Sequence, residues 1–171
     1  MAERTWLLLR HGIAEERIVP PPEDPDQARA LDAARRLTER GRQRTEAVLR
    51  QLLAAGLLGD QLLSSPLVRA HETAALAVAV GLAPSLELAP SLAPGGDPLP
   101  LLQRPARRLI LVGHEPDLSA LACRLIGAPA GSLVLRKAGS ILLSLDPAAG
   151  ASSPLPCARL RLLLRPRALL A

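Results

Sequence analysis

The sequence predicts an α/β fold with a mainly parallel sheet, and three observations indicate it. Short apolar runs alternate with segments of helical periodicity over the first two-thirds of the chain. The last two apolar runs have no long helix between them, so they are expected to close the sheet as antiparallel strands. The length of 171 residues, with 49% hydrophobic and 22% charged residues, fits one domain that spans residues 1–171.

The first half of the chain is expected to contain two strands, each followed or preceded by a helix. Thr38 is a good N-cap, and Gly56 is a typical residue just beyond a helix end. Ser65 and Pro66 are expected to cap and open a further helix. The proline-rich segment 19–26 is expected to form a loop. The expected strands and helices lie at residues 5–9, 38–55, 61–63 and 65–80.

The second half is expected to contain a long loop, a buried strand, a helix and two closing strands. The loop over residues 84–105 contains six prolines, with one short strand near Leu86–Leu88. A loop of this length in a compact domain is usually functional or mobile. Pro116 is expected to open the helix that follows the buried strand. The remaining expected elements lie at residues 108–112, 116–126, 140–145 and 159–164.

Charge and composition favour some partners over others. The formal net charge is +5 and Lys137 is the only lysine, so arginine supplies the positive charge and suits anionic oxygens. Trp6 is the only aromatic ring, so the chain is not expected to build a stacking platform for nucleic acid. No apolar run is long enough to span a membrane. The two cysteines, Cys123 and Cys157, suit a reducing compartment, and a cytoplasmic location is expected.

Three polar features follow predicted strands. They are Arg10-His11-Gly12, the segment from Ser65 to Arg69, and His114. Ligands of open α/β sheets bind outside the carboxyl ends of the strands, so these features are expected to converge in one crevice. Two of them lie at helix N-termini, which favour an anion.

Two histidines and two arginines around an anion site indicate phosphoryl transfer. A neutral imidazole nitrogen can attack phosphorus and form a phosphohistidine. Fixed cations can neutralise the oxygens of the transferring group. Neither a metal nor any other cofactor is required by this chemistry.

Five segments of the chain resemble the histidine phosphatase (phosphoglycerate-mutase-like) superfamily. Within it, the sequence is most similar to the small SixA-type phosphohistidine phosphatases. One matching segment alone would be weak, but all five occur in the family's order. The segments are residues 7–12 (LLLRHG), 36–41 (RLTERG), 65–74 (SPLVRAHETA), 92–97 (LAPGGD) and 111–116 (LVGHEP).

The resemblance implies a three-layer α/β/α sandwich and a metal-independent phosphohistidine phosphatase. His11 matches the family's phosphorylated nucleophile, and Arg10, Arg69 and His114 match the rest of its phosphate pocket. The chain has little room for the long insertion that covers the site in mutases. An open pocket is therefore expected, and it suits a phosphohistidine on a partner protein.

The roles of several charged residues near the motifs stay open. Many superfamily members use an acid to protonate an oxygen leaving group, and Glu115 is one candidate, although it could instead cap the helix at Pro116. Glu15, Glu16 and Asp97 are other acids near the motifs. Arg36 could reach the site or could simply pair with an acid.

Two alternative functions remain beside the leading one. The first is a small-molecule phosphomonoesterase of the same superfamily, acting on a sugar phosphate or another metabolite. The second is a phosphate-binding module without chemistry. The expected partners are a phosphorylated protein or a small phosphomonoester, and a monomer is favoured.

Overall fold

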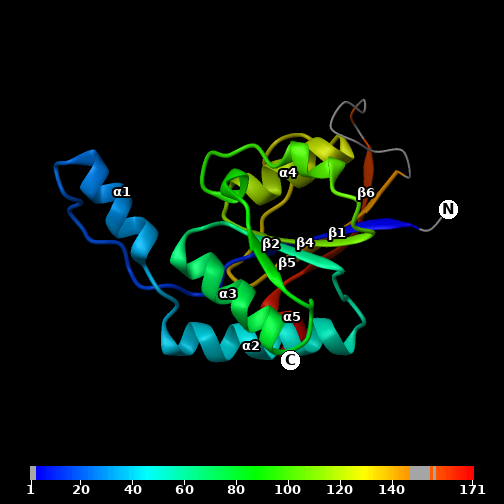
Figure 1. Cartoon of the computed structure of the whole chain (residues 1–171), viewed down its shortest axis with the longest axis horizontal. Helices are drawn as coiled ribbons and strands as arrows, with labels where there is room; N and C mark the ends of the chain where they lie inside the picture. The colour runs from blue at the N-terminus through cyan, green and yellow to red at the C-terminus, as the bar shows by residue number, and fades with distance from the viewer. Residues whose placement is uncertain (1–2, 147–154, 156) are drawn as a thin grey trace.

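The computed structural model describes residues 3–146, 155 and 157–171 and is built around one six-stranded sheet (Figure 1). The strands are β1 (Arg4–Arg10), β2 (Gln61–Ser64), β3 (Leu86–Leu88), β4 (Arg108–Gly113), β5 (Ser140–Leu145) and β6 (Ala158–Leu164). The helices are α1 (Pro25–Ala34), α2 (Glu39–Ala54), α3 (Val68–Ala79), α4 (Asp117–Ile126) and α5 (Pro166–Leu169), with 3-10 turns η1 (Pro90–Leu92) and η2 (Leu99–Gln103). In this described part of the chain, no helix combines the length and hydrophobicity needed to cross a membrane.

The sheet is parallel on one side and antiparallel on the other. Its strand order is β3-β2-β4-β1-β5-β6. The four strands β3, β2, β4 and β1 pair in parallel, whereas β5 runs antiparallel to both β1 and β6. This topology confirms the prediction of a mainly parallel sheet that ends in antiparallel closing strands.

Helices cover both faces of the sheet, which confirms the three-layer architecture. Along β1, successive side chains alternate between the two faces. Trp6 and Leu8 belong to the core cluster that contains Leu121 of α4. Leu7 and Leu9 belong to the opposite cluster, beneath α2 and α3. Figure 1 shows α4 on one side of the sheet and α2, α3 and α5 on the other.

The start of α2 is packed against the loop that follows β1. Thr38 caps the helix as predicted, because its Oγ1 accepts a hydrogen bond from the Gly41 amide at 2.9 Å. A Cβ atom at Gly41 would lie 2.0 Å from the carbonyl oxygen of Ile13. Only glycine therefore allows the helix to approach this backbone so closely. The close approach fixes the loop that carries the residues after β1.

The start of α3 differs from the prediction. The helix begins at Val68, and its N-cap, Leu67, makes no side-chain hydrogen bond. Ser65 is not the cap of this helix. Its hydroxyl lies 2.8 Å from Nε2 of His114 and also accepts the Leu67 amide at 3.3 Å. Ser65 therefore belongs to the polar cluster at the sheet edge, and Pro66 lies in the connection before the helix.

Helix α1 was not predicted from the sequence. Asp24 caps it by accepting the Asp26 amide at 2.9 Å, and Pro25 occupies its first turn. None of its residues is buried, and the helix begins inside the proline-rich segment that was expected to form a loop. Figure 1 shows that α1 extends away from the sheet and its covering helices.

Replacing Gly41 by alanine should destabilise the fold. The added Cβ would collide with the Ile13 carbonyl, and we expect the free energy of unfolding to fall by about 2–4 kcal/mol. Arg40→Ala, at an exposed position of the same helix turn, should change it by less than about 0.5 kcal/mol. Urea denaturation of both variants tests this, and equal stability of the two would contradict the packing argument.

Candidate active site

Two histidines meet at the carboxyl edge of the parallel strands. His11 follows β1 and His114 follows β4, and these strands pair with Arg10 opposite Gly113. The ring centroids of the histidines lie 5.1 Å apart at an interplanar angle of 54°. Both side chains are buried, with relative exposures of 6% and 3%. The topology thus brings together two residues that are far apart in the sequence.

Backbone contacts fix the proton position on His11. Its Nδ1 lies 2.7 Å from the carbonyl oxygen of Gly12. A carbonyl can only accept, so Nδ1 carries the proton and Nε2 has a free lone pair. Nε2 accepts a hydrogen bond from Nε of Arg69 at 3.3 Å. The nitrogen with the lone pair therefore faces a cation.

Arg69 reaches the histidines from the first turn of α3. Its side chain is buried, with 4% exposure, and its guanidinium is also bound by Asp32 of α1. Nη1 donates to the Asp32 carbonyl at 2.6 Å, and Nη2 donates to Asp32 Oδ2 at 3.0 Å. Asp32 was missed by the sequence interpretation, because nothing in the motifs signals a contact between α1 and α3.

Arg10 and His114 complete the cluster. Nη1 of Arg10 donates to the carbonyl oxygen of Leu135 at 2.9 Å. Within the described residues, Nε of Arg10 and Nδ1 of His114 are buried and have no hydrogen-bond partner. Buried polar atoms are normally paired. If the Ser65 hydroxyl donates to Nε2 of His114, both unpaired nitrogens are donors that could bind the oxygens of an anion.

Burial keeps both histidines neutral near pH 7. It lowers the pKa of His11 from 6.5 to about 3, with further lowering by His114 and the two nearby arginines, against the raising effect of the Gly12 hydrogen bond. It also lowers the pKa of His114 from 6.5 to about 4, where Arg69 adds to the effect of burial. A neutral imidazole is the form that can act as a nucleophile.

Gly12 is required by the packing around His11. A Cβ atom at this position would lie 2.1 Å from Oγ1 of Thr45. The Gly12 amide donates to Oγ1 of Thr73 at 3.1 Å, and this hydroxyl donates to the Arg69 carbonyl at 2.8 Å. The glycine that follows His11 and the threonine of α3 therefore connect the loop that carries His11 to the helix that carries Arg69.

Arg36 and Glu115, whose part in the site was left open, both make contacts with other groups in this structure. Arg36 has a side-chain exposure of 69% and pairs with Glu72 at 3.0 Å. Glu115 accepts the Ser119 amide at 3.0 Å and the Leu135 amide at 3.4 Å. Glu115 thus stabilises the first turn of α4 from the position before the N-cap, which is Pro116 and not Glu115 as the alternative interpretation had it.

Two of the other acids near the motifs also bind groups other than the histidines. Glu15 accepts the backbone amide of Arg36 at 3.0 Å. Asp97 accepts the Leu99 amide at 3.2 Å and lies 3.5 Å from Arg124. The carboxylate that shares a partner with His11 is instead that of Asp32.

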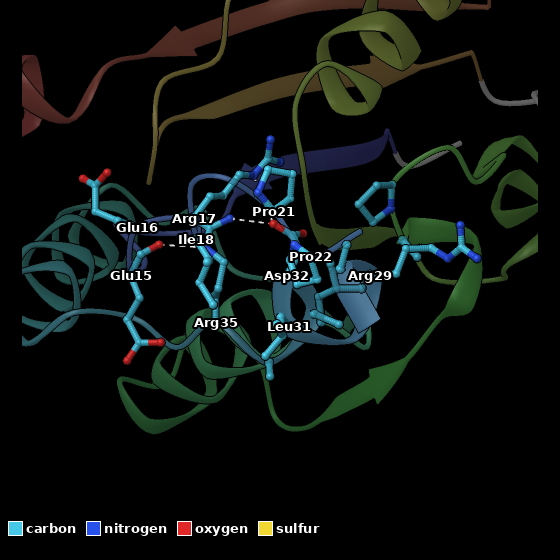
Figure 2. Close-up of a pocket in the computed structure, with 16 residues that line it drawn as sticks. Glu15, Glu16, Arg17, Ile18, Pro21, Pro22, Arg29, Leu31, Asp32 and Arg35 are labelled. Atoms are coloured by element: carbon cyan, nitrogen blue, oxygen red, sulfur yellow. Dashed lines mark hydrogen bonds and ion pairs between the residues drawn. The ribbon is translucent and has the colours of Figure 1, made fainter. Parts of the chain in front are cut away.

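A cavity of about 760 Å³ lies between α1 and the loop that precedes it. Figure 2 shows the labelled side chains of this loop and of α1 around it. Asp32 and Leu67 both line the cavity, so it borders the turn that carries Arg69. Its walls are largely apolar, as is typical of sites for small ligands. Exposed apolar side chains of this region include Ile18 and Leu31.

Comparison with known proteins identifies the family. Residues 6–92 match the model of the histidine phosphatase superfamily (branch 1). An uncharacterized protein of Picosynechococcus sp. is 39% identical over 140 residues, which cover 77% of this chain and 79% of that protein. The chain therefore belongs to the histidine phosphatase superfamily, and its activity class is that of a phosphatase, a hydrolase.

Solved structures with low sequence identity share the fold. The structure of the protein histidine phosphatase SixA complexed with tungstate superposes with a TM-score of 0.76 at 19% identity, covering 96% of this chain and 99% of that chain. A mycobacterial glucosyl-3-phosphoglycerate phosphatase superposes with a TM-score of 0.66 at 18% identity, covering 92% and 97% of the two chains. One is described as acting on protein histidine and the other on a small phosphate ester, so the shared fold does not select the substrate.

The lowered histidine pKa values predict a loss of stability in acid. Below pH 6.5 the unfolded chain binds protons that the folded site excludes, down to about pH 4 at His114 and about pH 3 at His11. The free energy of unfolding is therefore highest above pH 6.5 and declines as the pH falls through this range. The loss should reach up to about 2 kcal/mol per histidine at pH 5. In urea denaturation at pH 7 and pH 5, His114→Gln should lose less stability between the two pH values than the unsubstituted chain. An unchanged pH dependence would contradict the burial effect.

Proposed function

We propose that this chain is a phosphohistidine phosphatase that works through a phosphorylated His11, without a metal. The observation that carries the proposal is the hydrogen bond from His11 Nδ1 to the Gly12 carbonyl. It leaves an unprotonated Nε2 beside Arg69 in a buried cluster of basic side chains. Such a nitrogen is a competent nucleophile toward phosphorus.

The reaction proceeds in two displacements at phosphorus. In the first, Nε2 of His11 forms a bond to the phosphorus, and the phosphorus–nitrogen bond of the substrate breaks. Its electron pair goes to the leaving imidazole nitrogen, which takes a proton from solvent. In the second, water attacks the phosphorus, and the electron pair of the bond to Nε2 returns to His11. Inorganic phosphate leaves, and the water's proton passes to solvent.

The basic side chains stabilise the charge of the phosphoryl group during both steps. Arg69 and Arg10 present fixed positive charge at the edge of the sheet where His11 lies. His114 adds a hydrogen-bond donor through its buried Nδ1. Preorganised donors in a water-poor site are usually the largest contribution to catalysis. An anion in the pocket would also favour the protonated form of His114.

The ionised carboxylate near His11 favours a substrate whose leaving atom is nitrogen over one whose leaving atom is oxygen. An alkoxide must receive a proton as it leaves, whereas an imidazole needs much less help. The carboxylate that shares Arg69 with His11 belongs to Asp32, whose pKa is held below its ordinary value by Arg35 and Arg69 despite partial burial. It is therefore ionised at neutral pH and poorly suited to donate a proton. A protein-borne phosphohistidine is the proposed substrate.

A small phosphomonoester is the second candidate substrate, and the cavity beside α1 favours it. Its volume of about 760 Å³ falls in the range of sites for small molecules. The apolar walls could hold the organic part of an ester while its phosphate lies on His11.

Removing the nucleophile should abolish turnover without unfolding the chain. We expect His11→Ala to reduce kcat by at least about 10⁴-fold and to prevent labelling of the protein by a radioactive phosphoryl donor. His71→Ala, at an exposed position of α3, is the matched control and should keep both activity and labelling. Residual turnover by His11→Ala at the level of the control would remove His11 from the mechanism.

A substrate comparison separates the two candidate functions. Purified protein without added metal is incubated with a phosphohistidine-containing protein and with a panel of sugar and other small phosphomonoesters. We expect kcat/KM to be at least about tenfold higher for the phosphohistidine, because its leaving group needs no acid. Faster hydrolysis of a monoester would instead assign the cavity to a small-molecule substrate.

A further inference from the structure

The turn that leads into β5 lies beside the two histidines. Because β5 runs antiparallel to β1, it begins at the edge of the sheet where β1 ends. The Ala138 amide donates to the carbonyl oxygen of His11 at 3.0 Å. The Arg10 amide donates to the carbonyl oxygen of Gly139, also at 3.0 Å, and the Arg10 side chain donates to the Leu135 carbonyl at 2.9 Å. The turn is thus hydrogen-bonded directly to the end of β1 and to His11.

These contacts hold the backbone of the turn in an unusual conformation. Ala138 has a φ of 58°, in the left-handed region that favours glycine. The Gly139 amide donates to the Arg136 carbonyl at 2.7 Å and closes the turn. A residue with a side chain persists in this region when the surrounding structure holds it there. Positions 136 and 137 are therefore presented to solvent from a backbone that is fixed against the candidate site.

Two cations, Arg136 and Lys137, occupy these positions and are called the basic turn below. Both are exposed, and within the described part of the chain neither forms an ion pair. The arginines beside α1 differ, because Arg17 and Arg35 both pair with the Asp32 carboxylate. The basic turn therefore carries positive charge that no carboxylate of the described residues neutralises by direct contact.

The charge of the basic turn also acts on the cluster around His11. Burial lowers the pKa of Arg10, the Glu115 carboxylate raises it, and the charge of Arg136 lowers it again. The Glu115 carboxylate accepts the amides of Ser119 and Leu135, so it is held by the start of α4 and by the segment before the turn. An additional anionic group next to Arg136 would relieve its repulsion with Arg10.

The segment before the basic turn also exposes an apolar side chain. Val134 has a relative exposure of 53%. Protein interfaces combine apolar contacts with charged groups around them, and the charges select a partner of complementary sign. This segment and the basic turn together therefore suit contact with a protein surface that carries carboxylates.

We infer that the basic turn docks a protein substrate that carries acidic side chains beside its phosphohistidine. The inference rests on the phosphohistidine substrate proposed above and adds the chemistry of its surroundings. A phosphoryl group on His11 places the neighbouring residues of the substrate at the edge of the sheet, where the turn is hydrogen-bonded to His11. Carboxylates at this place compensate the charges of Arg136 and Lys137. Charges at the rim of an interface mainly speed association, and salt screens their effect.

Two phosphohistidine peptides of equal length test the inference. One has glutamate on both sides of the phosphohistidine, and the other has glutamine at the same positions, so that they differ in charge but hardly in size. At low ionic strength we expect kcat/KM to be about tenfold higher for the glutamate peptide, because complementary charge speeds association. At an ionic strength of about 0.5 M the preference should fall below about twofold.

A double substitution locates the preference on the basic turn. Arg136→Gln/Lys137→Gln should hydrolyse both peptides with equal kcat/KM, and its value for the glutamine peptide should stay within about twofold of that of the unsubstituted chain. The glutamine peptide thus reports that the variant is folded and active. Arg107→Gln/Arg159→Gln is the matched control. It removes the same charge from exposed positions at the opposite edge of the sheet and should keep the preference.

Each other result contradicts the inference in a distinguishable way. Equal hydrolysis of the two peptides by the unsubstituted chain would refute the docking alone. A preference that survives in Arg136→Gln/Lys137→Gln would assign it to other cations. An equal loss for both peptides in this variant would mean that the turn serves the phosphoryl group or the fold. If the unsubstituted chain hydrolyses neither peptide, the proposed phosphohistidine substrate fails, and the inference fails with it.

Discussion

The candidate active site depends on the parallel pairing of β1 with β4. Because the two strands run in the same direction and in register, the chain leaves both of them at one edge of the sheet. The His11 amide extends the pairing by donating to the Gly113 carbonyl at 3.1 Å. On the other side of β4, the Ser65 amide donates to the Val112 carbonyl at 2.9 Å. These two hydrogen bonds hold His11 and its neighbours at the positions where the strands end.

The sequence predicted best those candidate site residues that directly follow a predicted strand. His11 and His114 could be predicted to meet, because each follows an apolar run that reads as a buried strand, and parallel strands share one carboxyl edge. Arg69 could be added because the first turn of a helix that follows a strand points to the same edge. The structure brings all three together, and the distances between them come from packing that no local pattern contains.

Local sequence patterns gave a wrong or missing prediction at Ser65, Asp32 and helix α1. Ser65 before Pro66 is a standard sign of a helix start, but the serine hydroxyl lies against His114, and the helix begins later. Asp32 carried no signal at all, because its contact with Arg69 joins two helices that are distant in sequence. Helix α1 was also missed. It begins at Pro25, inside a proline-rich segment that is typical of a loop, and it buries none of its residues.

Helix α1 is exposed and lies outside the cores that stabilise the fold, yet it borders the candidate active site. The apolar cores lie on the two faces of the sheet, and α1 contributes no buried residue to either. Substitutions in α1 and in the loop before it can therefore accumulate at little cost to folding. The same substitutions reshape the cavity and the surroundings of Arg69. Selection can thus change what reaches this edge of the sheet through α1 and its loop while His11, His114 and the sheet stay the same.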